Sequence, residues 1–442
     1  MRFYFETYGC QMNSAESAAL VLVCKEHGWQ EAADSESADL ILLNTCSVRL
    51  TAEKRVLGRI AHYAGLKKKH RRFTLVIAGC MAQRLGEDLK EKYPAVDYVM
   101  GTSARSFFPL ILQAAEKGEK AALDLTENAV FSFSSSHLEE GQFRSFIPIM
   151  HGCDNFCSYC IVPYVRGREV SRDPQNIAEE MRLVAGRGVR EITLLGQNVN
   201  SYFWENDKMD FSALLRFTAD TAVKTGIKWI RFLSANPRNF SSEAVKVMAE
   251  NPVFCRHLHL PVQHGSNSVL KAMNRGYTRE RYLELAGEIR AAMPGITLST
   301  DILAGFPGET EEDLEQTLDL MEEIKFLYAY MYHFNPREGT KAFDLPGRIS
   351  EKVKKERLSE IIALQKKHTS KLLKSRIGSK ETVLIEGISR KNADELITRT
   401  EKDEMVVVPG PSSMIGSFAE VTLCALKGNT FISEELNLCR VD

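Results

Sequence analysis

The stretch Gly152-Cys153-Asp-Asn-Phe-Cys157-Ser-Tyr-Cys160 decides how the centre of this chain folds and what it can bind. Three cysteines within eight residues can surround one iron–sulfur cluster, as the local cysteine runs of ferredoxins do. A ferredoxin cubane takes four cysteines, whereas this loop offers three. An iron atom without a protein ligand can bind a small molecule, so the loop indicates catalysis rather than electron transfer alone.

A structural zinc loop is the alternative interpretation of the same cysteines. Structural zinc sites are closed by four protein ligands, and this loop lacks the fourth. Zinc here would imply a metal-stabilised binding module rather than an enzyme. The spacing favours iron and sulfur.

Strand-like and helical segments alternate from the cysteine loop onward. Six such βα units predict a complete or partial parallel barrel, whose reactive face lies at the loops that follow the strands. An open doubly wound sheet is the alternative. The cysteine loop follows the first predicted strand, so it belongs to that face. The predicted strands are Phe146–Met150, Glu191–Leu195, Trp229–Phe232, His257–Pro261, Thr297–Leu303 and Tyr328–His333.

The first hundred residues repeat an apolar strand, a cysteine just past its carboxyl end, and a helical stretch. This alternation predicts a doubly wound parallel sheet, whose ligands bind outside the carboxyl ends of the strands. Right-handed crossovers return each strand to the same edge, so cysteines about 35 residues apart converge in space. The strands are Phe3–Gly9, Asp39–Thr45 and Thr74–Gly79, and the cysteines are Cys10, Cys46 and Cys80.

A polar linker is predicted from Gly118 to about Phe143, between the N-terminal sheet and the barrel. Two further segments follow the barrel. The segment Lys352 to Lys380 is predicted to form one long helix, with ten Lys or Arg against two Glu. Five short strand-like runs then predict a small β-barrel of the size of an RNA-binding domain. These runs are Glu381–Glu386, Glu395–Thr400, Glu404–Val408, Phe418–Ala425 and Thr430–Ser433.

Length and composition agree with a chain of several domains, because 442 residues exceed one compact core. The patterns divide it into residues 1–118, 139–375 and 376–442.

No long apolar stretch or signal-peptide pattern is present, so we expect a cytoplasmic protein. In that compartment, ten cysteines favour metal or redox chemistry over disulfides. The net charge of -1 conceals two basic runs, Lys67–Arg72 and Lys352–Arg376, which offer a cationic track for RNA phosphates.

The CxxxCxxC spacing, with Tyr159 directly before the third cysteine, resembles the signature of the radical S-adenosylmethionine superfamily. The resemblance implies that Cys153, Cys157 and Cys160 hold a 4Fe-4S cluster whose open iron chelates the methionine part of S-adenosylmethionine. An electron from such a cluster cleaves the sulfonium and gives a 5'-deoxyadenosyl radical. Tyr159 is implied to lie near the adenine.

Two other segments of the predicted barrel resemble cofactor-binding loops of that superfamily. Leu195-Gly-Gln-Asn198 follows the second strand, where relatives place a loop against the methionine amino group. Asp301-Ile-Leu-Ala-Gly-Phe-Pro-Gly-Glu309 is similar to their adenine-side motif. The candidate cofactor-binding residues are Tyr159, Gly196, Gln197, Ser234, Gln263 and Asp301.

Further motifs are Tyr8-Gly-Cys10-Gln-Met-Asn13 with Asn44-Thr-Cys46 and Gly79-Cys80, and Pro163-Tyr-Val-Arg-Gly-Arg168-Glu-Val-Ser-Arg172. With the C-terminal barrel, which is like a TRAM domain, they resemble the methylthiotransferase family over nearly the whole chain. Within it, Gln11-Met12-Asn13 and Gly167-Arg168-Glu169 favour the MiaB branch, which acts on N6-isopentenyladenosine of tRNA. The resemblance implies that the three N-terminal cysteines hold a second 4Fe-4S cluster, whose open iron carries the sulfur to be transferred.

The implied reaction places a methylthio group on C2 of an adenine ring. That carbon bears a strong C–H bond with no acidic proton and no leaving group, so the cofactor must supply the difficult chemistry. The resemblance implies that one S-adenosylmethionine methylates the cluster-bound sulfur and a second provides the radical. Implied partners are tRNA carrying N6-(dimethylallyl)adenosine, an electron donor such as flavodoxin or ferredoxin, and a sulfur donor. A monomer is implied.

Two alternatives remain open at this point. Sibling methylthiotransferases that act on threonylcarbamoyladenosine in tRNA, or on a ribosomal protein, share the cysteines. A metal-stabilised RNA-binding module with zinc at both sites is the non-enzyme alternative. The other four cysteines, Cys24, Cys255, Cys424 and Cys439, are expected to be ordinary thiols.

Overall fold

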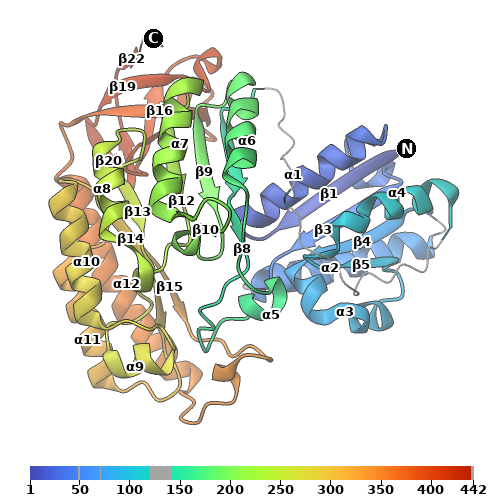
Figure 1. Cartoon of the computed structure of the whole chain (residues 1–442), viewed down its shortest axis with the longest axis horizontal. Coiled ribbons are helices and arrows are strands. Elements are labelled where there is room, and N and C mark those ends of the chain that lie inside the picture. Colours follow the sequence, from blue (N-terminus) through green and yellow to red (C-terminus); the bar gives the residue numbers. More distant parts are fainter. Residues whose placement is uncertain (48–49, 70, 120–132, 134–140, 440–442) are drawn as a thin grey trace.

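The computed structural model describes residues 1–47, 50–69, 71–119, 133 and 141–439. An N-terminal parallel sheet, a central arc of strands and helices, and a C-terminal sheet follow one another along the chain (Figure 1). Most of the predicted linker lies outside the described residues. No helix in the described part of the chain is both long and apolar enough to cross a membrane.

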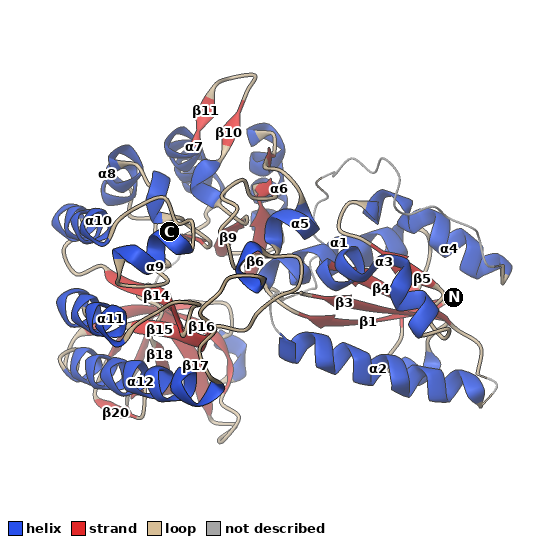
Figure 2. Ribbon diagram, turned by 90° about the horizontal axis from the view of Figure 1, so that it is seen from below, coloured by secondary structure: helices blue, strands red, loops and turns tan. Residues whose placement is uncertain are grey.

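The N-terminal sheet has the strand order β2-β1-β3-β4-β5, and all its strands run parallel. Helices α1 and α4 pack on one face, and α2 and α3 on the other, with α2 and α4 seen on opposite sides in Figure 2. This confirms the predicted doubly wound sheet. Its order reverses between β1 and β3, where such sheets bind ligands. The bounds are β1 (Arg2–Tyr8), α1 (Gln11–Glu26), β2 (Gln30–Glu31), β3 (Leu40–Thr45), α2 (Leu50–Lys68), β4 (Thr74–Gly79), α3 (Cys80–Lys92), β5 (Tyr98–Met100) and α4 (Phe108–Lys117).

The central domain is a partial parallel barrel. Its six long strands form two three-stranded sheets, β6-β9-β12 and β13-β14-β15, and a single buried core runs through both. Helices lie along the outside of the arc (Figure 2). The strands are β6 (Arg144–Pro148), β9 (Glu191–Leu195), β12 (Trp229–Phe232), β13 (His257–His259), β14 (Thr297–Ala304) and β15 (Tyr328–His333), and the helices are α6 (Pro174–Gly186), α7 (Phe211–Thr225), α8 (Ser242–Glu250), α10 (Arg279–Ala292), α11 (Glu311–Ile324) and α12 (Glu351–Lys374).

Short elements decorate the loops of the barrel. Strands β7 and β8 pair antiparallel beside the cysteine loop, and α5 follows that loop directly. The hairpin β10–β11 and the helix α9 lie in two later loops. Their bounds are β7 (Met150–His151), α5 (Val162–Arg166), β8 (Val170–Ser171), β10 (Phe203–Trp204), β11 (Met209–Asp210) and α9 (Asn267–Ala272).

Helix α12 ends at Lys374, so the predicted helix from Lys352 to Lys380 was too long. Gly378 has a φ of +88°, which breaks the helix, and Lys380 already begins β16. The run of basic residues continued past the helix end and concealed it.

The C-terminal domain is a mostly antiparallel seven-stranded sheet that surrounds one buried core, as in a small barrel. The five predicted runs are all found. One of them is divided into β19 and β20, and β22 was not predicted. The bounds are β16 (Lys380–Ile388), β17 (Glu395–Thr400), β18 (Met405–Pro409), β19 (Phe418–Thr422), β20 (Ala425–Lys427), β21 (Thr430–Ile432) and β22 (Leu436–Leu438).

This C-terminal sheet closes the end of the central barrel at which the barrel strands begin. Arg144, the first residue of β6, pairs with Glu386 at 2.5 Å. At the start of β12, the rings of Trp229 and Phe418 meet edge to face with centroids 4.8 Å apart. The cysteine loop lies at the opposite end of the strands, so the two ends of the barrel are covered by different parts of the chain.

Candidate metal centre and cofactor site

The three N-terminal cysteines follow three neighbouring strands at the same height. Tyr8 of β1 pairs with Thr45 of β3, which pairs with Gly79 of β4. The cysteines come within two residues of these aligned positions, so they gather at the carboxyl edge of the sheet, beside the reversal of strand order. They are Cys10, Cys46 and Cys80.

The thiols of this trio act on one another electrostatically, and Arg166 acts on them as well. The Cys46 thiol, followed by the positive charge of Arg166, lowers the pKa of the Cys10 thiol to about 6 against the effect of burial. Burial raises the pKa of Cys80, while Arg166 acts in the opposite direction. The trio therefore faces a fixed positive charge.

Two asparagines brace this edge of the sheet. Asn13 accepts a hydrogen bond from the Cys10 thiol at 3.3 Å and donates one to Asn44 at 3.0 Å. Both amides are buried. A Cβ atom on Gly9 would lie 2.5 Å from Asn13 Oδ1 and 2.9 Å from Cys46 Cβ, so only glycine leaves room for this packing. The motifs around Cys10 and Cys46 thus have a structural explanation.

The second cysteine trio lies on the loop between β7 and α5, after the first barrel strand. Gly152 has a φ of +81°, and a Cβ there would lie 2.0 Å from the Arg168 carbonyl oxygen, so the turn into the loop requires glycine. Burial raises the pKa of Cys153 to about 11 and that of Cys160 to about 12. Neighbouring thiolate charges, chiefly that of Cys157, act in the same direction, which shows that this trio also converges.

The donor set fits two iron–sulfur clusters. None of the six thiols forms a disulfide, and soft thiolates are the preferred ligands of such clusters. In the described part of the chain, no three His, Cys, Asp or Glu side chains are spaced for a single metal ion. A zinc ion bonds all of its thiolates itself, whereas the thiolates around a cluster bind different irons and therefore stand farther apart.

The candidate cofactor residues lie around the cysteine loop at the ends of the barrel strands. Gln197 Oε1 accepts a hydrogen bond from the backbone N–H of Gly152 at 2.6 Å, which ties the loop after β9 to the cysteine loop. Gly196 lies against Met150, where a Cβ would approach within 2.5 Å of the side chain. Tyr159 is half-buried and packs with Phe306 of the predicted adenine-side motif.

The remaining candidates show unusual backbone geometry or shared strand pairing. Ser234 and Gln263 have φ values of 66° and 74°, which non-glycine residues adopt rarely and mainly at functional sites. Gln263 pairs with β14 through a backbone bond to the Asp301 carbonyl oxygen of 2.9 Å. Asp301 Oδ1 lies 3.7 Å from His259 Nε2. The structure thus brings Gln263 and Asp301 together and Gln197 to the cysteines, and the Ser234 carbonyl oxygen accepts from the Val199 N–H of the Gln197 loop at 3.3 Å.

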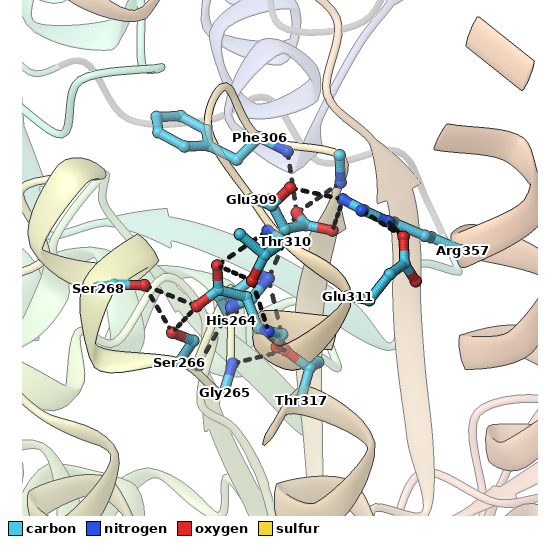
Figure 3. Close-up of polar contacts among 12 residues, drawn as sticks. His264, Gly265, Ser266, Ser268, Phe306, Glu309, Thr310, Glu311, Thr317 and Arg357 are labelled. Carbon is cyan, nitrogen blue, oxygen red and sulfur yellow. Dashed lines mark hydrogen bonds and ion pairs between the residues drawn. The ribbon is translucent and has the colours of Figure 1, made fainter. Parts of the chain in front are cut away.

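A buried polar network fixes the loop after β14 (Figure 3). Glu309 Oε2 accepts the backbone N–H groups of Gly305 at 2.7 Å and Phe306 at 3.0 Å, and Oε1 accepts from Arg357 of α12 at 3.0 Å. His264 Nε2 lies 3.4 Å from Oε2, and its Nδ1 accepts from the N–H of Ser266, which indicates the Nε2–H tautomer. Glu309 therefore joins the two loops that follow β13 and β14.

The second half of this network caps α11. Asp313 accepts hydroxyl hydrogen bonds from Ser266 at 2.5 Å, Ser268 at 2.6 Å and Thr310 at 2.9 Å. Burial raises its pKa, but these bonds lower the pKa more, from an ordinary 3.8 to about 2. The loops around Gln263 and Glu309 are thus rigid parts of the barrel rim.

Sequence reasoning missed two buried arginines at the cysteines. Arg275 donates to the Cys157 sulfur at 3.3 Å, to the Tyr159 hydroxyl at 3.4 Å and to the Pro261 carbonyl oxygen at 2.9 Å. Arg166 faces the N-terminal trio. Of the two, only Arg166 could have been found from the sequence, because it lies within the motif from Pro163 to Arg172.

Comparison with known proteins agrees with this division of the chain. Residues 2–101 match an uncharacterized protein family, UPF0004, residues 147–321 match the radical SAM superfamily, and residues 374–432 match the TRAM domain. A tRNA-2-methylthio-N(6)-dimethylallyladenosine synthase of Treponema denticola is 49% identical, over 98% of this chain and 99% of the relative. A synthase of the same name from Geotalea uraniireducens is 43% identical, over 99% and 98%.

The chain belongs to the tRNA-2-methylthio-N(6)-dimethylallyladenosine synthase family. Among solved structures, the radical S-adenosylmethionine methyltransferase TsrM of Kitasatospora setae has a TM-score of 0.58 at 15% identity, covering 77% of this chain and 74% of that one. That likeness concerns the fold. The radical SAM match and the synthase family bring 4Fe-4S clusters and S-adenosylmethionine as cofactors, as predicted, while the assignment of one cluster to the second trio stays a prediction.

The basic runs expected to contact RNA in this synthase family member are only partly available. In the first run, Lys67 pairs with Asp97 and Arg71 donates to the Ser35 carbonyl oxygen, whereas Lys68, Lys69 and Arg72 are exposed. On α12, Arg357 points inward to Glu309. The exposed basic residues of that helix include Lys366, Lys367, Lys371 and Lys374.

Proposed function

We propose that this chain adds a methylthio group to C2 of N6-(dimethylallyl)adenosine in tRNA. The observation that carries the proposal is the meeting of two three-cysteine sites at one end of the barrel, joined by the short helix α5. Family membership supports the substrate. A binding module would need neither the missing fourth ligand at both sites nor the buried arginines beside them.

The cysteines and their neighbours have separate tasks in this proposal. The N-terminal trio and the barrel trio each hold a 4Fe-4S cluster, and S-adenosylmethionine, when bound, supplies both a methyl group and a radical able to abstract hydrogen from an unactivated carbon. Arg275 donates to Cys157 and so stabilises a thiolate there. Gln197 fixes the loop, and Tyr159, which is partly buried and packs on the cluster that contains Phe306, offers an aromatic ring for the adenine.

Rigid positioning and exclusion of water are the protein's share of the chemistry. The residues proposed for S-adenosylmethionine are Tyr159, Gly196, Gln197, Ser234, Gln263 and Asp301. The loops that carry Gln263 and Asp301 are braced by the network around Glu309, so the geometry of the pocket is set before the cofactor binds.

We propose that RNA contacts the exposed lysines of α12 and the C-terminal sheet. The charge of Lys366, Lys367 and Lys371 is suited to phosphates, although Lys367 also pairs with Glu322 at 3.4 Å. An electron donor such as flavodoxin or ferredoxin and a separate sulfur donor complete the reaction, and the chain acts as a monomer with domain limits near residues 118, 139 and 376.

The decisive experiment expresses the chain in a bacterial host that lacks its own methylthiotransferase and analyses digested tRNA by mass spectrometry. The expected result is 2-methylthio-N6-isopentenyladenosine, which disappears in Cys157→Ala. Cys255→Ala is the matched control, because Cys255 is buried outside both trios and should not affect the product. If the nucleoside is absent from the tRNA although the protein contains iron and sulfide, the substrate is threonylcarbamoyladenosine or a ribosomal protein instead.

A further inference from the structure

Arg166 joins the barrel to the N-terminal domain beside the first cysteine trio. It is the last residue of α5, six residues after Cys160. Its Nη1 donates to Glu16 of α1 at 2.6 Å, and both side chains are only 3% exposed. The two domains therefore meet through a charge pair that is shielded from water, where Coulomb interactions are strong.

The groups around this guanidinium come from both domains. Glu16 also lies 3.8 Å from Arg105, so one carboxylate is shared between two guanidinium groups. His151 Nδ1 of β7 lies 3.4 Å from Arg166. One carboxylate thus faces two guanidinium groups, so a net positive charge remains at this point.

The same helix packs directly against a cysteine of the N-terminal trio. Cys80, Ile161 and Val165 form one buried cluster, and Thr102 Oγ1 donates to the Val165 carbonyl oxygen at 2.7 Å. The position of the Arg166 side chain is thus fixed by contacts on both sides of the domain boundary. Arg166 directly follows Val165 on this helix, so its guanidinium is held beside the cysteine site against which the helix packs.

We propose that Arg166 is a positioning residue that belongs to the barrel in sequence but serves the N-terminal cysteine site, where its buried charge stabilises the reduced, more negative state of the group held there. The inference rests on the proposed function, because it requires a redox-active cluster at Cys10, Cys46 and Cys80. Charges and hydrogen bonds near cluster sulfurs are established determinants of cluster potential. Glu16 opposes Arg166 in this respect while it anchors the guanidinium.

Two substitutions of this pair separate the electrostatic role from a merely structural one. Arg166→Gln removes the positive charge and should lower the midpoint potential of the N-terminal cluster. Glu16→Gln removes the negative charge and should raise it. A loss of packing would shift both variants in the same direction, whereas the charge model predicts opposite signs.

The potential is measured by redox titration monitored by electron paramagnetic resonance, in the full chain with Cys153, Cys157 and Cys160 replaced by alanine, so that one cluster reports. Arg166→Lys should restore most of the wild-type value, because it keeps the charge. The matched control is Arg172→Gln, since Arg172 is an equally buried arginine whose partner is Glu180 within the barrel. It should leave the potential unchanged.

Several results would overturn the inference. They are an unchanged potential, shifts of equal sign in Arg166→Gln and Glu16→Gln, or an equal shift in the Arg172 control. If Arg166→Gln does not fold, Glu16→Gln decides alone, and an unchanged or lower potential refutes the inference. Iron analysis of the chain that lacks the barrel cysteines separates failure of this inference from failure of the proposed function. Absence of iron from that chain would refute the proposed function as well.

Discussion

Replacing Glu309 with glutamine tests whether a buried charge holds the loop after β14. In the native side chain, Oε2 accepts two backbone N–H groups, those of Gly305 and Phe306, and Oε1 accepts from Arg357. Glutamine has one oxygen. If that oxygen keeps the backbone bonds, the amide NH2 group faces the guanidinium, donor against donor.

The expected loss follows from these contacts. A hydrogen bond to a charged group contributes about 1.5–3 kcal/mol, and breaking a buried ion pair costs about 3–5 kcal/mol. Arg357 keeps Glu311 at 2.5 Å and the Glu309 carbonyl oxygen at 2.9 Å, which limits the loss. We expect Glu309→Gln to reduce the free energy of unfolding of the barrel by about 2–4 kcal/mol. For a domain of this size the melting temperature should fall by about 5–15 °C.

Differential scanning calorimetry measures this change, with Glu312→Gln as the control. Glu312 is exposed and occupies the first turn of the same helix, α11. It undergoes the same chemical change without entering the network of Figure 3. Titration calorimetry with S-adenosylmethionine should also show weaker binding by Glu309→Gln. A melting temperature equal to that of the control would refute the idea that charge fixes this loop.

Three other predictions concern iron, pH and RNA. Cys46→Ala and Cys157→Ala should each lose about half of the bound iron of the anaerobically purified protein, as measured by atomic absorption, and a full loss in either variant would contradict two separate clusters. Hydrogen bonds lower the pKa of Asp313 from 3.8 to about 2, so its stabilisation is complete above about pH 4 and disappears as the pH falls toward 2. Asp313→Asn should therefore cost about 1 kcal/mol at pH 7 and flatten the acid unfolding curve, which circular dichroism can follow. Neutralising Lys366 and Lys371 should reduce the slope of log affinity for tRNA against log salt by about 0.7–0.9 per lost phosphate contact, and an unchanged slope would remove α12 from the interface.

Long, strongly patterned elements could be read from the sequence. All six barrel strands and three of the N-terminal strands were predicted because strand-like segments alternate with helical segments in these parts of the chain. Strands β2 and β5 were missed, since they contain two and three residues and show no periodicity. The end of α12 was missed because Lys374 and Lys380 look alike in composition, although only the first is helical.

The candidate site likewise contains residues that the sequence could predict and residues that it could not. The cysteine positions followed from strand ends and local spacing, both of which are visible in one dimension. The partnership of Arg166 with Glu16 was not visible, because it joins residues 150 positions apart. Arg275 likewise reaches Cys157 across 118 positions. Only the folded chain brings such pairs together, and neither residue type is unusual at its own place in the sequence.

Closure of the barrel at both ends sets a minimum length for anything that touches both. The C-terminal sheet covers the start of the strands and the cysteine loops lie at their finish, so the two are separated by the length of the strands, which for the eight residues of β14 is about 26 Å. A free nucleoside or a very short oligonucleotide can reach one end only. An RNA stem-loop can lie along the outside and reach both. If RNA contacts both ends, as proposed, the distance between them distinguishes a folded RNA from a short fragment before any base is recognised.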